Sequence, residues 1–260
     1  MSISLKQQNW QHFTLHHLRD WYGIWTRYSP SGNVTNSFTS QRSFESNPQK
    51  TEIVQTNHYI YADGTTEKRS WEYNEVSNSR WDGLFHPESE SMRGFFFGSG
   101  HAAWATTKLE LGSYFAVELF FICNELRHSV GVVYDKLGSL LRIANIREDA
   151  RGFPSQYWSD ELNQLPQRNF TGNWQGTSVV MTRDLKISAP IPTELKFPLG
   201  SNKTFFLPDG VSVSCPDQVD VGSCFTIAAN WRLELETMQQ LLIYYDESGS
   251  FCTLTLEHTN

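Results

Sequence analysis

A hairpin pattern that occurs twice constrains the fold of this chain more than any other feature. Each copy opens with Gly-Ser-x-Phe, continues through alternating apolar residues, and turns at Tyr-Asp-x-x-Gly-Ser. The first copy spans residues 112–139 and the second spans residues 222–250. Strand side chains alternate between two faces, so each run predicts a long antiparallel hairpin with one apolar face. The repetition predicts an internal duplication.

The turn of each hairpin carries an aspartate followed by a glycine, at Asp135 and Gly138 in the first copy and at Asp246 and Gly249 in the second. An Asp side chain can accept backbone N–H groups of its own turn, and Gly tolerates a positive φ. We therefore interpret both aspartates as turn formers and not as catalytic groups.

Further landmarks precede each hairpin in the same order. A first helix is predicted up to about Arg19, because Ser4 and Gln7 fit a capping box. A second helix is predicted between two prolines, over residues 155–165. An aromatic-x-Gly-x-Trp sequence follows each helix, at residues 21–25 and at residues 170–174. Three landmarks in one order strengthen the prediction of a duplication.

The expected architecture is all-β. Aromatic residues make up 14% and charged residues 19% of the chain, and turn signals separate many short strand-like segments. Residues 1–150 hold about eight or nine such segments, enough to close an antiparallel barrel around a small cavity. Residues 151–260 predict a smaller barrel, filled by its own side chains. We expect two barrels, each preceded by a short helix, with the loop 77–93 irregular.

The two long hairpins differ on one face. In the second copy the alternation from Phe225 to Leu235 separates an apolar inner face from a polar, wetted outer face. In the first copy Phe115 and Phe121 belong to the predicted inner face, but Phe120 and Ile122 fall on the outer one. Such an outward apolar pair needs cover, either from the helix or the other barrel, or from a second protein.

Charge and hydropathy limit the partners. The net charge is −7, and from Thr204 onward Arg232 is the only basic residue against eight acidic ones. Nucleic acid is therefore not expected as a partner, whereas a basic protein surface would fit; ordinary solubility explains the same charges. Neither a secretory signal nor an apolar run of about 20 residues is found, which predicts a cytoplasmic protein without a membrane span.

No motif indicates a metal, a cofactor or a catalytic centre. His12 and His16 have the i, i+4 spacing of two metal ligands, but no third ligand is nearby in sequence. The four cysteines have no Cys-x-x-Cys spacing. They are expected to be reduced, with a Cys215–Cys224 disulfide as the alternative. No nucleophile elbow, phosphate loop or dinucleotide fingerprint is present, so catalytic residues and cofactors are not predicted.

A helix, then Gly-x-Trp in the first strand, then an antiparallel meander resembles the lipocalins and the wider calycin group. In that group the Trp packs across the closed end of the barrel, commonly against an Arg from the last strand. The resemblance implies that Arg142 or Arg147 stacks on Trp25.

The block from Asn9 to Pro30 is similar to an uncharacterised family of cyanobacterial and chloroplast proteins with two calycin barrels. A plant chloroplast member of that family is an assembly factor for the catalytic head of ATP synthase. The resemblance therefore implies a protein partner, with ATP synthase subunits as the example. The S-type phycobiliprotein lyases are a related group of single calycin barrels that bind a bilin.

Two functions follow from these observations. The first is a non-catalytic assembly factor, which would contact its partner through Phe120 and Ile122. The second is an intracellular carrier of an apolar or tetrapyrrole (bilin) ligand in the first barrel; if it catalysed a reaction, bilin attachment would be the expected one. The expected wall residues of that pocket, which could equally fill the core, are Trp25, Trp104, Phe115, Phe121 and Tyr134.

Overall fold

The structure is a computed structural model that describes residues 3–168, 174–197, 199–200, 202–233 and 237–259. Nearly all of its regular structure is β, and a single helix of 12 residues stands at the beginning of the chain. The helices are α1 (Leu5–His16) and the four-residue α2 (Glu75–Asn78).

Eighteen strands are found within the described residues. The strands of the first sheet are β1 (Trp21–Tyr28), β2 (Val34–Ser46), β3 (Glu52–Tyr61), β4 (Thr66–Asn74), β5 (Ser79–Arg80), β6 (Gly83–His86), β7 (Ser89–Phe96), β8 (Ala102–Thr106), β9 (Phe115–Cys123), β10 (Leu126–Tyr134) and β11 (Leu140–Asp149). Those of the second are β12 (Gln175–Thr182), β13 (Ile191–Glu194), β14 (Lys203–Phe206), β15 (Val211–Cys215), β16 (Phe225–Arg232), β17 (Met238–Tyr245) and β18 (Phe251–Thr259).

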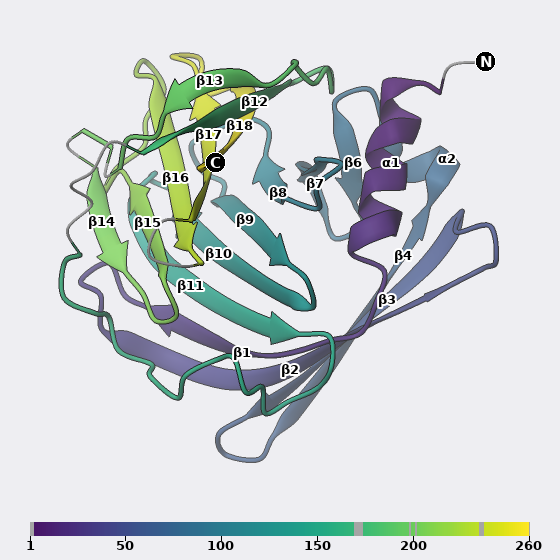
Figure 1. Cartoon of the computed structure of the whole chain (residues 1–260), viewed down its shortest axis with the longest axis horizontal. Helices are drawn as coiled ribbons and strands as arrows, with labels where there is room; N and C mark the ends of the chain where they lie inside the picture. Colours follow the sequence, from purple (N-terminus) through teal and green to yellow (C-terminus); the bar gives the residue numbers. More distant parts are fainter. Residues whose placement is uncertain (1–2, 169–173, 198, 201, 234–236, 260) are drawn as a thin grey trace.

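Both sheets are antiparallel, and the prediction of an all-β fold is confirmed; the second part, predicted as a smaller barrel, is a seven-stranded sheet. The first sheet runs β4-β3-β2-β1-β11-β10-β9-β8-β7-β6-β5 and is a nearly closed barrel (Figure 1). The second sheet runs β13-β12-β18-β17-β16-β15-β14. The loop expected to be irregular, residues 77–93, in fact contains β5, β6 and the beginning of β7.

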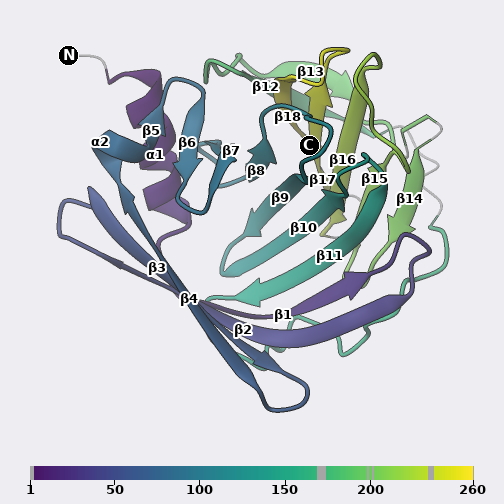
Figure 2. The ribbon, with the colours of Figure 1, turned by 180° about the vertical axis from the view of Figure 1, so that it is seen from behind.

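The two sheets share one hydrophobic core. The side chains of Phe115 and Tyr245 lie 5.0 Å apart between ring centroids, and those of Phe95 and Phe251 lie 4.4 Å apart. The second sheet packs on one side of β8–β10 and helix α1 lies on the other side (Figures 1 and 2). Consequently one face of these strands belongs to the shared core and the opposite face to the inside of the first barrel.

The direction of the β9 side chains differs from our interpretation. Phe115, Val117 and Phe121 belong to the core between the sheets, whereas Phe120 faces the interior of the first barrel with 3% of its surface exposed. Alternation separates two faces of a strand but does not say which of them points into the barrel. Because the second sheet covers the more apolar face, the other one became the barrel interior.

The outer face of the second hairpin also differs from expectation. Asn230 was expected in water, yet it is fully buried. The segment before β14 covers this face: the Gln240 side-chain amide donates to the Lys196 carbonyl oxygen at 3.2 Å, and the Asn202 side chain donates to the Thr226 carbonyl oxygen at 3.0 Å. The two glutamates of the predicted outer face, at 234 and 236, lie outside the described residues.

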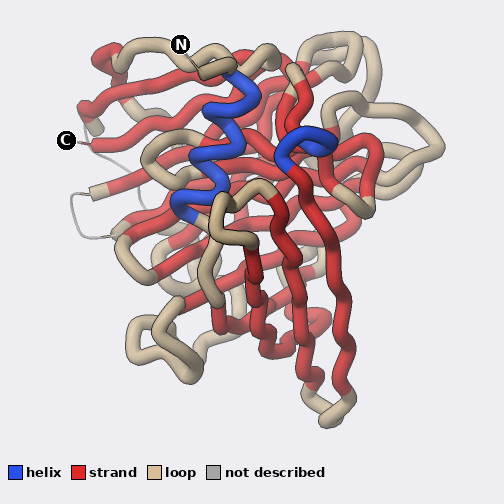
Figure 3. The backbone as a smooth tube through the Cα atoms, turned by 90° about the vertical axis from the view of Figure 1, so that its right-hand side faces the viewer, coloured by secondary structure: helices blue, strands red, loops and turns tan. Residues whose placement is uncertain are grey.

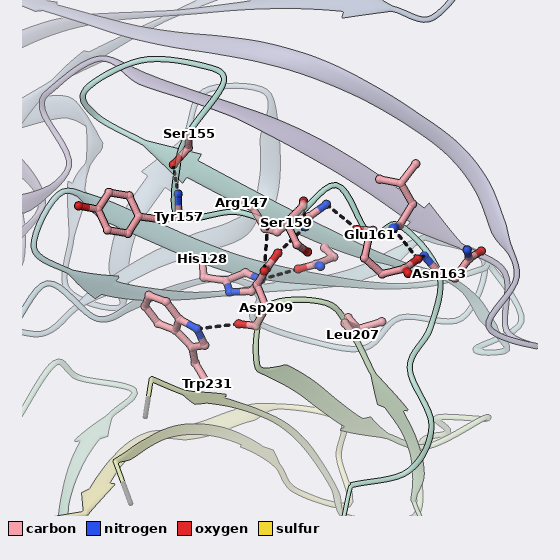
Figure 4. A network of polar contacts seen from close by, with 12 residues as sticks. His128, Arg147, Ser155, Tyr157, Ser159, Glu161, Asn163, Leu207, Asp209 and Trp231 are labelled. Carbon is pink, nitrogen blue, oxygen red and sulfur yellow. Dashed lines mark hydrogen bonds and ion pairs between the residues drawn. The ribbon is translucent and has the colours of Figure 1, made fainter. Parts of the chain in front are cut away.

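The second predicted helix is not formed. Residues 155–165 contain turns and bends, and they lie along β11 (Figure 4). The buried guanidinium of Arg147 accounts for this, because it donates to the carbonyl oxygens of Ser159 at 2.9 Å and Glu161 at 3.1 Å. Asp209 forms an ion pair with Arg147 and accepts the Ser159 N–H. These backbone groups therefore bond to the neighbouring strands and not within a helix.

The second aromatic-x-Gly-x-Trp sequence, at residues 170–174, lies almost wholly outside the described residues, with only Trp174 inside them. By contrast, the predicted turns are confirmed: Asp135 accepts the backbone N–H groups of Leu137 and Ser139. The Asp246 carboxylate makes the equivalent bonds in the second copy.

Candidate functional site

A cavity of about 310 Å³ lies inside the first barrel. Its walls come from α1 and from strands β1–β4 and β6–β10. This volume is at the lower end of the range of small-molecule sites, about 300–1,000 Å³. The walls are rich in aromatic rings, among them Trp25, Tyr59, Trp71, Tyr73, Trp104 and Phe120.

Helix α1 is bound to the barrel by polar side chains that meet alternate residues of one strand and the turn after it. Asn9 donates to the Gly94 carbonyl oxygen at 2.9 Å. Ring nitrogens of His12 and His16 on the same helix, and of His17 directly after it, lie 2.7–3.0 Å from the carbonyl oxygens of residues 96, 98 and 100. In the extended strand β7 every second carbonyl points to the same side of the strand, so those of Gly94 and Phe96 both face α1. Figure 3 shows α1 running across the strands at this side of the barrel.

Two of these histidines, His12 and His16, have the spacing of two metal ligands on one helix face. Each instead contacts a backbone carbonyl, His12 that of Phe96 and His16 that of Gly98. Within the described ranges no group of three or more His, Cys, Asp or Glu side chains could hold a metal ion. All four cysteines are free, so the alternative Cys215–Cys224 disulfide is absent.

Beneath the cavity a buried carboxylate joins two arginines. Glu148 Oε2 lies 2.7 Å from Arg127 Nε, and Glu148 Oε1 lies 3.1 Å from Arg42 Nε. Burial alone would raise the pKa of Glu148, but the two guanidinium groups hold it below its ordinary value. The Glu148 side chain is fully buried, while both arginines line the cavity. The glutamate thus fixes two cationic side chains in the cavity wall.

Both arginines also stack on tryptophans. The Arg42 guanidinium carbon lies 4.7 Å from the ring centroid of Trp25, and that of Arg127 lies 4.3 Å from Trp21. Trp25 therefore stacks on an Arg of β2. The resemblance implied Arg142 or Arg147 instead, and that expectation was wrong, because Arg147 points to the opposite side of β11.

His17 closes the cavity at the end of α1. Its Nε2 lies 3.0 Å from the Gly100 carbonyl oxygen and therefore carries the proton. Its Nδ1 is then the acceptor for Arg127 Nη1 at 3.4 Å. Burial, together with the charge of Arg127, holds the pKa of His17 well below its ordinary value. The imidazole is therefore neutral at physiological pH.

Two donors in the cavity wall have neither a hydrogen bond nor an ion pair. Arg127 uses Nε and Nη1 as described, but its buried Nη2 has no hydrogen-bond partner. The indole Nε1 of Trp71 is likewise buried and unpartnered. Buried donors are normally satisfied, so an unpartnered one in a cavity wall indicates where an acceptor could bind.

One carboxylate faces the same part of the cavity. Glu118 on β9 accepts the Ser129 hydroxyl at 2.9 Å, and its Oε1 lies 3.5 Å from Arg42 Nη2. Its side chain is 23% exposed, in contrast to 0% for Glu148. Glu118 is therefore the less tightly paired of the two glutamates.

The residues that we predicted for this site are divided between two places. Trp25 and Trp104 line the cavity. Phe115, Phe121 and Tyr134 lie in the core between the sheets, on the other face of the barrel wall. Both sets are aromatic residues of amphipathic strands, so residue type alone could not separate them.

Of the two residues proposed as a protein contact, Phe120 lines the cavity and Ile122 is half-buried on the same strand. Phe120 is covered by the helix: its ring lies 6.0 Å from that of His17. The helix is one of the three possible covers for this pair, beside the other barrel and a second protein.

Sequence reasoning missed the charged residues of the cavity, Arg42, Glu118, Arg127 and Glu148. One signal was available, since Glu118 interrupts an otherwise apolar strand. The partners are far apart in sequence, however, and only the barrel brings them together.

A nearly closed antiparallel barrel with a helix at its cavity, packed on a second antiparallel sheet, defines a lipocalin-like protein with two β units. Residues 6–153 match the N-terminal domain of DUF3598, a domain of unknown function, and the chain belongs to this family. Residues 198–259 match the C-terminal domain of the biogenesis factor required for ATP synthase 1. No curated protein matches the chain.

Among solved structures, the chain is similar to a protein of unknown function of the DUF3598 family from Nostoc punctiforme. The two share 20% sequence identity with a TM-score of 0.73, over 96% of this chain and 97% of that one. This likeness shows that the fold is shared. An S-type phycobiliprotein lyase from Guillardia theta is also found, with 11% identity, a TM-score of 0.38, and coverage of 56% of this chain and 94% of that one.

Among the residues that the structure describes, no helix is both long enough and apolar enough to cross a membrane.

Proposed function

We propose that this protein is a non-catalytic assembly factor that binds subunits of ATP synthase. The observation that carries the proposal is the match of residues 198–259 to the C-terminal domain of the biogenesis factor required for ATP synthase 1. That segment contains β14–β18, which are five of the seven strands of the second sheet. The second sheet is therefore the part of the molecule where we expect the partner to bind.

An exposed region of this sheet has the character of a protein contact. The acidic side chains of Asp217, Asp220 and Glu247 are exposed. Beside them, Val221 is 49% exposed and Tyr244 38% exposed. Apolar side chains with a charged rim are typical of protein interfaces, and the negative rim would favour a basic partner surface.

The test is a binding measurement between the purified protein and purified ATP synthase subunits. Reversing two charges of the rim, with Asp220→Lys and Glu247→Lys together, should weaken binding by about tenfold or more. A matched control carries Glu45→Lys and Glu72→Lys, two exposed glutamates of the first sheet, and should bind as the unaltered protein does. Absence of binding by the unaltered protein would overturn the proposal.

A second function, carriage of a small apolar or tetrapyrrole ligand, is favoured by the aromatic cavity of the first barrel. Native mass spectrometry of the protein purified from its source organism should then show an added mass, and a conjugated pigment would also absorb visible light. A mass equal to that of the bare chain, together with no uptake of added fatty acid or bilin, would count against ligand carriage.

A further inference from the structure

The charged part of the cavity defines the chemistry of its ligand more closely than the aromatic walls do. We propose that the cavity binds an unsaturated organic anion, whose acidic group is held by Arg127 and Arg42 while its planar body lies among the aromatic rings. This inference rests on the second function above, ligand carriage by the first barrel, and adds the class of ligand.

The first argument is the hydrogen bonding of Arg127. Its Nε is used by Glu148 at 2.7 Å and its Nη1 by His17 at 3.4 Å, but Nη2 has no partner in a residue that is 98% buried. An arginine has donors only, so the missing partner must be an acceptor. A carboxylate or sulfonate oxygen is the strongest acceptor for a guanidinium group.

The second argument is charge. Three arginines and two glutamates line the cavity, and they are Arg42, Arg69, Arg127, Glu88 and Glu118. Arg69 is 51% exposed and paired with Glu67, so it belongs to the solvent side. Near Arg127 the lining groups are two cations and the weakly paired Glu118. The fully buried Glu148 behind them offsets one positive charge, so what remains for a ligand is the unused Nη2 donor of Arg127.

The third argument is that His17 does not compete for the acceptor. Its Nε2–H is used by the Gly100 carbonyl oxygen, and its Nδ1 accepts from Arg127. It thereby holds the guanidinium group in place without supplying the missing acceptor for Nη2. Trp21 and Phe120 flank the same group, with ring centroids 4.3 and 5.5 Å from its central carbon. The donor is therefore pre-positioned, which reduces the entropy lost on binding.

The body of the ligand is indicated by the walls. Trp104 lies 4.9 Å from His86 and 5.8 Å from Phe96, both edge to face. Trp25 and Tyr59 meet in the same way at 5.9 Å. Faces and edges of rings offer favourable contacts to a planar π system, and a ligand with unsaturation would use them better than a saturated chain would.

The test uses two fluorescent probes that differ in one group. 1-Anilinonaphthalene-8-sulfonate carries a sulfonate, and N-phenyl-1-naphthylamine has the same aromatic body without it. The unaltered protein should bind the sulfonate at least about tenfold more tightly than the neutral probe, as expected for a charge-assisted hydrogen bond. Equal affinity for both probes would overturn the inference and leave ligand carriage standing. If neither probe bound, ligand carriage itself would fail.

Two variants locate the acidic group. Arg127→Lys keeps a positive charge beside Glu148 but removes Nη2. It should weaken the binding of the sulfonate probe by about tenfold and change the affinity for the neutral probe by less than about twofold. The matched control is Arg147→Lys, since Arg147 is also a fully buried arginine paired with a carboxylate but faces away from the cavity. A loss of the same size in this control would show that the effect is structural and would contradict the assignment.

The third variant is expected to strengthen binding, which misfolding would not do. Glu118→Gln removes the carboxylate next to Arg42 and should increase the affinity for the sulfonate by several-fold, without an effect on the neutral probe. Unchanged or weaker binding of the sulfonate in Glu118→Gln would place the acidic group elsewhere and overturn the inference.

Discussion

The two copies of the hairpin have similar side chains and hydrogen bonds where they meet, and very different side chains on the faces turned away from each other. At the contact, equivalent backbone groups of the two copies form hydrogen bonds with each other. The Leu109 N–H donates to the Gly249 carbonyl oxygen at 2.8 Å, and the Val219 N–H donates to the Gly138 carbonyl oxygen at 2.9 Å. Each copy therefore presents the same groups to the other, as two identical subunits do in an isologous dimer.

The tyrosines before the two turns also make equivalent hydrogen bonds across the contact. The Tyr134 hydroxyl donates to the Pro216 carbonyl oxygen at 2.9 Å, and the Tyr245 hydroxyl donates to the Thr106 carbonyl oxygen at 2.8 Å. The duplicated pattern thus encodes a contact between the copies and not two separate barrel interiors.

The faces turned away from this contact have diverged. On the first copy this face carries Glu118 and Phe120 and borders a cavity. On the second copy it carries Asn230, which the segment before β14 helps to bury. We infer that the contact between the copies limits change on one face, while the other is free to acquire a binding site in one copy and a filled interior in the other.

The largest predicted effect is a loss of stability in acid, which comes from buried histidines of the first part of the chain. Burial lowers the pKa of His101, in the turn before β8, to about 4 and that of His128, in β10, to about 4, whereas His258 on β18 is exposed. His101 and His128 are neutral when folded, so the unfolded chain binds more protons below about pH 6.5. The free energy of unfolding should therefore fall between pH 6.5 and about 4, by up to about 1.4 kcal/mol per pH unit for each histidine.

Urea unfolding at pH 5, 6 and 7 measures this slope. His101→Gln should reduce it by up to about 1.4 kcal/mol per pH unit, because one proton uptake is removed. A slope that is the same in the variant and in the unaltered protein would show that His101 does not contribute.

The second prediction compares a buried carboxylate of each sheet. Glu148→Gln leaves Arg42 and Arg127 without their shared partner and should lower the free energy of unfolding by about 3–5 kcal/mol. Glu257→Gln alters a half-buried carboxylate of the second sheet, whose pKa is raised by burial. This variant should lower the free energy of unfolding by less than about 1 kcal/mol. Denaturant unfolding at pH 7 checks both, and similar losses would contradict the distinction.

The third prediction concerns the two turn glycines, which have φ angles of 79° at Gly138 and 73° at Gly249. A Cβ at Gly138 would lie 2.1 Å from the Val219 carbonyl oxygen, whereas one at Gly249 would lie 2.9 Å from Leu109 Cβ. In both alanine variants the positive φ should lower the free energy of unfolding by about 1–2 kcal/mol. In Gly138→Ala the loss should be about 1 kcal/mol larger, since a backbone carbonyl must move. Thermal and urea unfolding measure both losses, and equal losses would contradict a tight contact between residue 138 and the Val219 carbonyl.

The smallest predicted effect tests the symmetry of the contact. Tyr134→Phe and Tyr245→Phe each remove one hydrogen bond to a backbone carbonyl across the contact and should each lower the free energy of unfolding by about 1–2 kcal/mol. The two losses should agree within about 0.5 kcal/mol. A large loss in one variant only, measured by urea unfolding, would mean that the copies do not share the contact equally.

Local structure was predictable wherever neighbouring residues supply the reason for it. Helix α1 has the predicted capping box of Ser4 and Gln7, and the turns use Asp135 and Asp246 as expected. The helix over residues 155–165 was predicted from the same kind of local signal and was wrong. Its carbonyl groups are bonded to Arg147, which is distant enough in sequence that no local pattern could reveal the competition.

The sequence by itself determined most of the strands and their alternation, because these depend on side chains one or two positions apart, and it showed the duplication as a repeated pattern. Only the tertiary structure decided which face of β9 is the barrel interior, since a period of two is the same for either choice. It also decided the cavity chemistry, because Arg42, Arg127 and Glu148 meet only after β2, β10 and β11 are aligned. Burial of charge depends on the whole fold, whereas a strand depends on its own residues.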